Sequence, residues 1–366
     1  MSDTFLDIDL DKIRQNVIKL KKKADTKFAS VIKADAYGLG AVEIAKEIED
    51  LSDYFAVARI SEAKELRDNN IENKILTLGY VSLDDIEYCE DNDIEIAIYD
   101  LEFAKKINSI VKNKINCHLA LDTGHSRIGF REYEIEKIKQ LTKLKKLNFI
   151  GCFSHFATAD EKETKYTKKQ YEIFDFITSK IKDSFDFEII HISNDAGFLK
   201  HDISLDMVRS GICIYGIYPS DIIKKENAIK LEQAFELYST ITFIKNIKKD
   251  VAISYGRKFI SEKEMKIATI NIGYADGYMR SFSNCGEVLI NGHRCKVLGA
   301  VCMDQMMVDV TGIDVKIGQK VLIYPDIYKE AEKINTIAYE LMTSISKRVE
   351  RRYFKGNKLI SIKKSQ

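Results

Sequence analysis

The sequence lacks tryptophan, contains only 2 prolines in 366 residues, and has no apolar run long enough to span a bilayer. We therefore expect no transmembrane segment. The N-terminal stretch MSDTFLDIDLDKIRQN is acidic and has no long apolar core, so we expect no signal peptide and a cytoplasmic protein. The 7 cysteines are scattered and never form a C-x-x-C pair, which suits a reducing compartment and argues against structural zinc.

An excess of charge of one sign is also missing. The chain has 57 Lys+Arg against 56 Asp+Glu, which leaves a net charge of +1 at pH 7. No overall field attracts nucleic acid or an anionic membrane, so we expect a small-molecule partner instead. The 6 histidines contain no H-E-x-x-H motif and no paired spacing, so we expect no metal site.

Short apolar runs alternate with stretches of helical periodicity from about residue 27 to residue 216. The alternation predicts parallel strands joined by helices, and eight such units favour a (β/α)8 barrel over an open doubly wound sheet. Later in the chain, short strands and turn residues predict a second, mostly β domain, with ING as a hairpin signal. We therefore predict a barrel over 1–229 and a β domain over 230–366. The predicted barrel strands are 28–33, 54–59, 74–79, 94–99, 117–122, 149–154, 187–193 and 212–217.

Polar side chains stand where these predicted strands end or begin. In such a barrel the active face is built from the loops at the C-terminal ends of the strands. A single basic residue there would ordinarily be a solvated surface charge, but several at the ends of different strands indicate a site. These residues are Lys33, Arg127, His155, Asn194 and Arg209.

Lys33 points to a particular chemistry. A lysine at a barrel mouth suits Schiff-base chemistry, in which a neutral amine attacks an aldehyde. Pyridoxal 5'-phosphate is the natural cofactor for such a lysine, and Gly211 would let the chain approach the phosphate closely.

A series of motifs then extends along the chain. VIKADAYGLG, LDTGHSRIG, SHFATADE, HISNDA, VRSGICIYG, SYGRKF, NIGYADGY and VCMDQMMVDV resemble, in this order, the signatures of the alanine racemase family. The resemblance covers essentially the whole chain. It implies a (β/α)8 barrel, a C-terminal β domain, and a homodimer whose active sites are completed across the interface. The implied activity is the interconversion of L- and D-alanine, which supplies D-alanine for cell-wall peptidoglycan.

The resemblance also implies two proton-transfer bases. Lys33 would hold the cofactor covalently and act on one face of the substrate Cα, and Tyr274 of the other subunit would act on the opposite face. An ordinary tyrosine titrates near pH 10, so the Tyr274 phenolate would need stabilisation through His155. Arg209 would hydrogen-bond the pyridine nitrogen, which weakens electron withdrawal and favours racemisation over other reactions.

The remaining implied contacts hold the phosphate and the substrate. Arg127 would bind the substrate carboxylate, and Met303 of the partner subunit would line the substrate pocket. The phosphate would be surrounded by Tyr37, Asn194, Gly211, Ile212 and, as a weaker candidate, Tyr353.

The chain departs from the family pattern near these contacts. Many members carry a carbamylated lysine where this chain has Ala120, so Arg127 needs another partner, for which Asp122 and a bound anion are the alternatives. Asp195 replaces the usual serine, and its carboxylate would repel a phosphate unless it turned away. A serine or broad-specificity racemase therefore stays an alternative. A decarboxylase and a non-catalytic carrier of the cofactor are further alternatives.

Overall fold

The computed structural model describes residues 3–226 and 229–364 and contains two compact units. The larger unit runs through Lys12–Ala36 and Ala41–Gln233. The smaller unit combines the N-terminal segment up to Asp11, the short segment Tyr37–Gly40 and the segment that begins at Ala234. No helix in the described residues is long and apolar enough to cross a membrane.

The larger unit is the predicted (β/α)8 barrel. Its sheet has eight strands, each parallel to its neighbours, in the order β8-β7-β6-β5-β4-β3-β2-β9. Hydrogen bonds from Asp206 N–H to Ile190 O (3.1 Å) and from Arg209 N–H to Ser193 O (3.0 Å) bring the two outer strands together. The strands are β2 (Lys27–Val31), β3 (Tyr54–Val57), β4 (Lys74–Thr77), β5 (Ile94–Ile98), β6 (Ile115–Ala120), β7 (Leu147–Phe153), β8 (Ile189–His191) and β9 (Met207–Ser210).

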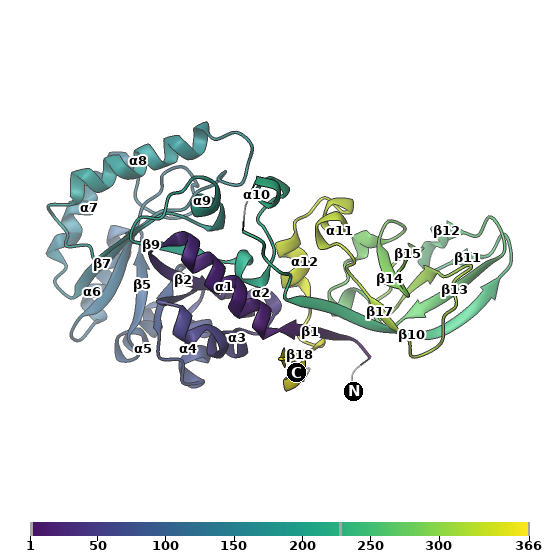
Figure 1. Cartoon of the computed structure of the whole chain (residues 1–366). Helices are drawn as coiled ribbons and strands as arrows, with labels where there is room; N and C mark the ends of the chain where they lie inside the picture. The colour runs from purple at the N-terminus through teal and green to yellow at the C-terminus, as the bar shows by residue number, and fades with distance from the viewer. Residues whose placement is uncertain (1–2, 227–228, 365–366) are drawn as a thin grey trace. The chain divides into compact units, whose positions relative to one another are not determined.

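Helices cover the outside of these strands (Figure 1). Because a barrel strand is buried by side chains inside and helices outside, strands such as β3 and β5 are buried at every position. The helices of this unit include α1 (Leu10–Ala24), α3 (Ala41–Ile48), α4 (Ile60–Asp68), α5 (Ile86–Asp91), α6 (Leu101–Ile110), α7 (Ile135–Gln140), α8 (Lys165–Ile181), α9 (Asp195–Lys200) and α10 (Asp221–Glu226).

The prediction of the eighth strand was wrong. The segment 212–217 does not form a strand, because Ile212–Tyr215 is a short 3-10 helix that ends at Gly216 in a left-handed conformation. The eighth strand is β9, just before it. All four residues of the 3-10 helix are buried, and a short apolar run has the same appearance in a buried strand and in a buried helical turn.

The smaller unit is built on a nine-stranded sheet in the order β13-β16-β15-β14-β17-β10-β1-β18-β19, with an additional pairing of β13 with β10. The predicted ING hairpin is confirmed, because Asn291 and Gly292 form the two-residue turn between β14 and β15 with positive φ at both. The strands are β1 (Phe5–Asp9), β10 (Phe235–Ile247), β13 (Met265–Ile270), β14 (Glu287–Ile290), β15 (His293–Leu298), β16 (Met306–Asp309), β17 (Lys320–Leu322), β18 (Glu350–Lys355) and β19 (Lys358–Lys363).

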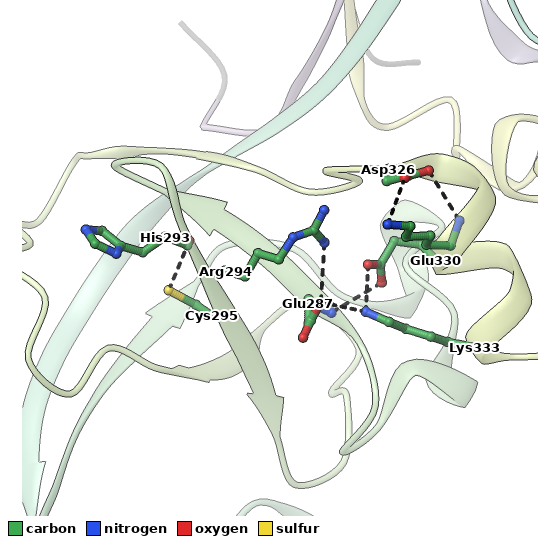
Figure 2. A network of polar contacts seen from close by, with 8 residues as sticks. Glu287, His293, Arg294, Cys295, Asp326, Glu330 and Lys333 are labelled. Carbon is green, nitrogen blue, oxygen red and sulfur yellow. Dashed lines mark hydrogen bonds and ion pairs between the residues drawn. The ribbon is translucent and has the colours of Figure 1, made fainter.

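Two helices and a small ribbon complete this unit: α11 (Ile327–Lys333), α12 (Ala338–Ser344), and β11 (Ala252–Ile253) paired with β12 (Phe259–Ile260). A polar network ties α11 to β14 (Figure 2). Lys333 donates hydrogen bonds to Glu330 (2.8 Å) and Glu287 (2.9 Å), and Arg294 donates one to Glu287 (3.3 Å). Because Glu330 is fully buried, its pairing with Lys333 offsets the cost of removing a carboxylate from water.

Candidate active site

Lys33 lies at the start of an unusual turn. Strand β2 ends at Val31, and Lys33 begins α2 (Lys33–Gly38). The next four residues, Ala34 to Tyr37, have φ of +54°, +53°, +52° and +56°, so this turn is left-handed. A left-handed helix of L-residues costs roughly 1–2 kcal/mol per residue, and such strain persists only where other contacts fix the backbone.

Carboxylates supply those contacts on the barrel side. Glu62 accepts the N–H of Ala34 (2.6 Å) and that of Ala58 (2.7 Å), and thereby ties the turn to the loop after β3. Asp35 accepts the N–H of Ala41 (2.8 Å) at the start of α3. The turn that carries Lys33 is thus held by ionised acceptors, which form stronger hydrogen bonds than neutral ones.

The following segment, Tyr37–Gly40, is held within the smaller unit. Arg351 donates to Gly38 O from Nε (3.2 Å) and Nη2 (3.1 Å), and the Tyr353 hydroxyl donates to Leu39 O (2.9 Å). Tyr353 is the weaker candidate for a contact with the phosphate, and its single hydroxyl proton is directed at the Leu39 carbonyl. Tyr37 is buried with its ring centroid 6.0 Å from that of Tyr339.

The environment of Lys33 favours a neutral amine. Burial lowers the pKa of Lys33, and the positive charges of Arg127 and Arg209 lower it further, against an opposing effect from Glu62. A lysine with a lowered pKa is a better nucleophile and base near neutral pH than an exposed one. This is the property that Schiff-base chemistry requires at this position.

Arg209 is a buried cation on β9 that organises several acceptors. Its Nη2 donates to Ser154 O (2.7 Å), Ile192 O (3.0 Å) and His155 Nδ1 (3.2 Å), and its Nη1 lies 2.6 Å from His191 Nδ1. None of the hydrogen bonds that this side chain makes with the described residues uses Nε. Burial lowers the pKa of Arg209 to about 9, so the guanidinium still carries its proton at neutral pH.

His155 is neutral in this environment. Burial lowers its pKa well below the ordinary value, and the positive charges of Arg209 and Arg127 act in the same direction. Because a guanidinium only donates hydrogen bonds, His155 Nδ1 accepts from Arg209 and the ring proton resides on Nε2. His155 therefore presents an N–H donor on the side away from Arg209.

At the predicted phosphate site, Asp195 accepts the hydrogen bond of the Gly211 N–H, which is one of the donors expected for the phosphate. Its carboxylate accepts from Ser210 Oγ (2.5 Å) and from the backbone N–H groups of Gly211 (3.0 Å) and Cys213 (3.4 Å). Burial raises the pKa of Asp195, while these three hydrogen bonds act against that rise. The Asn194 side chain caps α9 by accepting the Gly197 N–H (3.1 Å).

Arg127 follows β6 and is solvent-exposed. Its positive charge lowers the pKa values of Lys33, His155 and Arg209, so Arg127 lies near these three residues. Asp122, one alternative for bracing Arg127, instead forms an ion pair with Arg131 (2.9 Å). The other alternative, a bound anion, stays a prediction. The buried Ala120 lies in an apolar cluster with Ala97, Phe153, Leu78 and Tyr99.

In the smaller unit, the structure brings Tyr274 and Met303 together. Tyr274 N–H donates to Cys302 O (3.1 Å) and Ala275 N–H donates to Met303 O (3.0 Å). The Tyr274 and Met303 side chains are 42% and 53% exposed, although both are large and mostly apolar. Two adjacent exposed side chains of this kind are suited to contact with another molecule.

Sequence reasoning missed the polar residues that hold the site from behind. His191 contacts Arg209, and His118 and Glu95 lie in the buried strands β6 and β5. The available signal was a charged or imidazole side chain inside an otherwise apolar strand, which is seldom tolerated without a partner. Glu62 gave no such signal, because it lies on an ordinary amphipathic helix.

The comparisons with known proteins agree across both units. A model of the alanine racemase N-terminal domain matches residues 8–219, and one of the alanine racemase C-terminal domain matches residues 234–353. An alanine racemase of Clostridium perfringens strain SM101 is 40% identical over 376 residues, which cover 98% of this chain and 97% of that protein.

Solved structures extend the likeness. Alanine racemase from Clostridium difficile 630 is 41% identical, with a TM-score of 0.94 over 100% of this chain and 99% of that one. Alanine racemase from Bartonella henselae with covalently bound pyridoxal phosphate is 28% identical, with a TM-score of 0.88 over 97% of this chain and 100% of that one. With matches that cover both units and nearly the full length, this chain belongs to the alanine racemase family.

Proposed function

We propose that this protein interconverts L- and D-alanine with pyridoxal 5'-phosphate bound to Lys33. The observation that carries the proposal is the Lys33 amine at the end of a barrel strand. Its pKa is lowered by burial and by the positive charge of Arg127. The residues present fit the cofactor in a second respect, because Arg209 is a buried cation with its Nε–H unused among the described residues. The family, with its relative that carries covalently bound pyridoxal phosphate, supports the same choice.

Racemisation needs a base on each face of the substrate Cα, because a proton removed from one face must be replaced on the other. When bound, the cofactor supplies an electron sink that acidifies the Cα–H bond. Lys33 takes or returns the proton on one face at Nζ, and Tyr274 does so on the other face at its hydroxyl oxygen. Because the pKa of Lys33 is lowered, it exchanges protons in both directions at a lower pH than an exposed lysine does.

Arg209 sets the reaction type. Its Nε–H would donate to the pyridine nitrogen of the bound cofactor, and because the guanidinium keeps its own proton it would not protonate that nitrogen fully. Electron withdrawal into the ring would then be limited, which favours return of the proton to Cα. Racemisation is favoured in this way over decarboxylation, which would call for an acidic partner at the nitrogen.

Tyr274 acts from the other subunit of a homodimer. Its exposure beside Met303 supports this role, since both side chains are available to a second chain. A phenol with the ordinary pKa of about 10 is almost entirely protonated at neutral pH and cannot then accept a proton. The phenolate of Tyr274 therefore requires a hydrogen-bond donor that stabilises it. His155 of the receiving subunit provides the Nε2–H, fixed in that tautomer by Arg209.

Arg127 binds the substrate carboxylate, and Met303 of the partner subunit lines the pocket for the methyl group. An apolar thioether there favours alanine over serine, whose hydroxyl would lose its hydrogen bonds. Tyr37, Asn194, Gly211 and Ile212 would hold the phosphate of the bound cofactor. The reaction takes place in the cytoplasm, where the 7 free cysteines stay reduced, and its product is D-alanine for peptidoglycan.

The test is incubation of the purified protein with each L-amino acid in deuterated water. We expect Cα deuterium exchange and loss of optical rotation with alanine, and, after borohydride reduction and peptide mapping, a pyridoxyl group on Lys33. Faster exchange with serine than with alanine would make the protein a serine racemase. A label on Lys33 without exchange of any amino acid would make it a carrier, and a label on another lysine would refute the assignment of Lys33.

A further inference from the structure

A line of four buried polar side chains begins at Arg209 and crosses the barrel interior. Arg209 Nη1 lies 2.6 Å from His191 Nδ1, His191 Nε2 lies 2.9 Å from His118 Nδ1, and His118 Nε2 lies 2.8 Å from Glu95 Oε2. The Tyr54 hydroxyl donates to the other oxygen of Glu95 (3.2 Å). All four members of the line are at most 3% exposed.

The guanidinium end of the line determines the position of every proton in it, and the carboxylate at the other end accepts the last one. A guanidinium can only donate, so His191 Nδ1 accepts and its proton resides on Nε2. His118 Nδ1 must then accept from His191, which leaves the His118 proton on Nε2 to be donated to Glu95. An ionised carboxylate only accepts, so this arrangement satisfies every bond with both histidines neutral.

Glu95 is also the first carboxylate reached along the hydrogen bonds of Arg209. No carboxylate of the described residues lies within ion-pair distance of Arg209, and an unpaired buried cation is costly. The two neutral imidazoles therefore separate a cation from its counter-charge. Burial also lowers the pKa of His191, which keeps this ring neutral beside Arg209.

The barrel makes room for this line. His118 pairs with Gly151 on β7, where an added Cβ would lie 2.1 Å from His118 Nδ1. Phe153, on the same strand, stacks on the His191 ring with centroids 5.3 Å apart. The imidazoles are thus fixed by packing as well as by hydrogen bonds, and they have little freedom to rotate away.

We propose that Glu95 is a positioning residue for racemisation, which acts through His118 and His191 to hold Arg209 with its Nε–H directed at the cofactor. The inference rests on the proposed function for the role of Arg209. Glu95 itself contacts neither substrate nor cofactor. It accepts the last hydrogen bond of the line and places a carboxylate at the end opposite Arg209.

The variant that tests this is Glu95→Gln, which keeps the size of the side chain. A carboxamide has one acceptor and one donor group, so it can still accept from His118 but must then donate to Tyr54, and it removes the negative charge at the end of the line. We expect kcat for alanine to fall about tenfold with KM within about twofold, as when outer hydrogen-bond partners are lost at metal sites. Histidine 15N spectra of the full-length holoenzyme should show a shifted His118 Nε2 resonance, because this nitrogen then donates to a neutral oxygen instead of a carboxylate.

Three variants serve as controls. Glu95→Asp keeps the charge and should recover most of the activity, and Tyr54→Phe removes the second bond to Glu95 without breaking the line. Glu330→Gln neutralises a different buried carboxylate, the one paired with Lys333 in Figure 2. This variant should lower stability but leave the histidine spectra and kcat unchanged.

The outcomes separate the two proposals. Unchanged histidine spectra or an unchanged kcat in Glu95→Gln, with an active wild type, would overturn the inference alone. An equal loss of kcat in Glu330→Gln would also overturn it, because general destabilisation would then explain the effect. If the wild type racemises no amino acid, the proposed function fails and the spectra alone decide whether Glu95 holds the hydrogen bond of His118. Should Glu95→Gln not fold, His118→Gln breaks the same line and is judged by the same measurements.

Discussion

Lys33 combines burial with a neighbouring cation, and both lower its pKa. A free lysine has a pKa of about 10.4, so at neutral pH only a very small fraction of it is neutral. Because the pKa of Lys33 is lowered in the folded protein, its neutral fraction at a given pH is larger. The reactive form is reached at lower pH as a result.

The pH dependence of cofactor rebinding tests this property. When cofactor-free protein is mixed with pyridoxal phosphate, the rate should rise with pH about a midpoint below that of a free lysine. Arg127→Met removes a charge that lowers the pKa, so its midpoint should move to higher pH. Arg131→Met, which removes a cation paired with Asp122, is the control and should leave the midpoint in place. Equal midpoints in all three proteins would contradict the role of Arg127.

Asp195 offers a second prediction at a single residue. Its carboxylate occupies the Gly211 N–H and brings negative charge to the predicted phosphate site. Asp195→Ser should therefore tighten pyridoxal phosphate binding by about tenfold, the order of one hydrogen bond to a charged group. Absorbance titration of the cofactor-free variant measures this. Pyridoxal without the phosphate is the control and should bind both proteins equally, whereas weaker phosphate-form binding would show that Asp195 supports the loop instead.

At the scale of elements, the left-handed turn after β2 depends on its glycine. Gly38 has φ of +87°, and an added Cβ would lie 2.6 Å from Met342 O. Gly312 has a similar φ of +78°, but nothing lies within 4 Å of its added Cβ. These two positions share the same backbone requirement and differ in the space around them.

Alanine at each position separates strain from steric clash. Gly312→Ala should lower the free energy of unfolding by about 1 kcal/mol, from backbone conformation alone. Gly38→Ala should lower it by about 2–4 kcal/mol, because overpacking adds to the strain. Urea unfolding followed by circular dichroism gives both values. Equal losses would mean that the backbone near Gly38 relaxes to accept the methyl group.

The same elements show how far sequence reasoning extends. The buried barrel strands were predictable because strands covered on both faces are read as apolar runs, but this property also made 212–217 resemble a strand. The rule that barrel sites lie at strand ends selected Lys33, which follows β2, whereas Arg209 lies within β9 and not before a strand at 212–217. The left-handed turn and strand β1 were not predictable, since both depend on partners far along the chain.

At the scale of the whole molecule, the central question is which chain supplies Tyr274. The proposal assigns Lys33 and Tyr274 of each active site to different subunits of a symmetric dimer. Lys33→Ala and Tyr274→Phe should each abolish racemisation when tested alone. A mixed dimer of the two variants would differ from both, because one of its two sites combines the intact Lys33 of one chain with the intact Tyr274 of the other.

Mixing the two inactive variants therefore gives the decisive measurement. After equal amounts are unfolded together and refolded with cofactor, random pairing makes about half of the dimers mixed, each with one intact site of two. Activity should return to about a quarter of that of wild type refolded in the same way. Each variant refolded alone is the control and should stay inactive. If the mixture also stays inactive although mixed dimers are present, Tyr274 acts within its own chain, since no pairing of these variants then places both bases in one site.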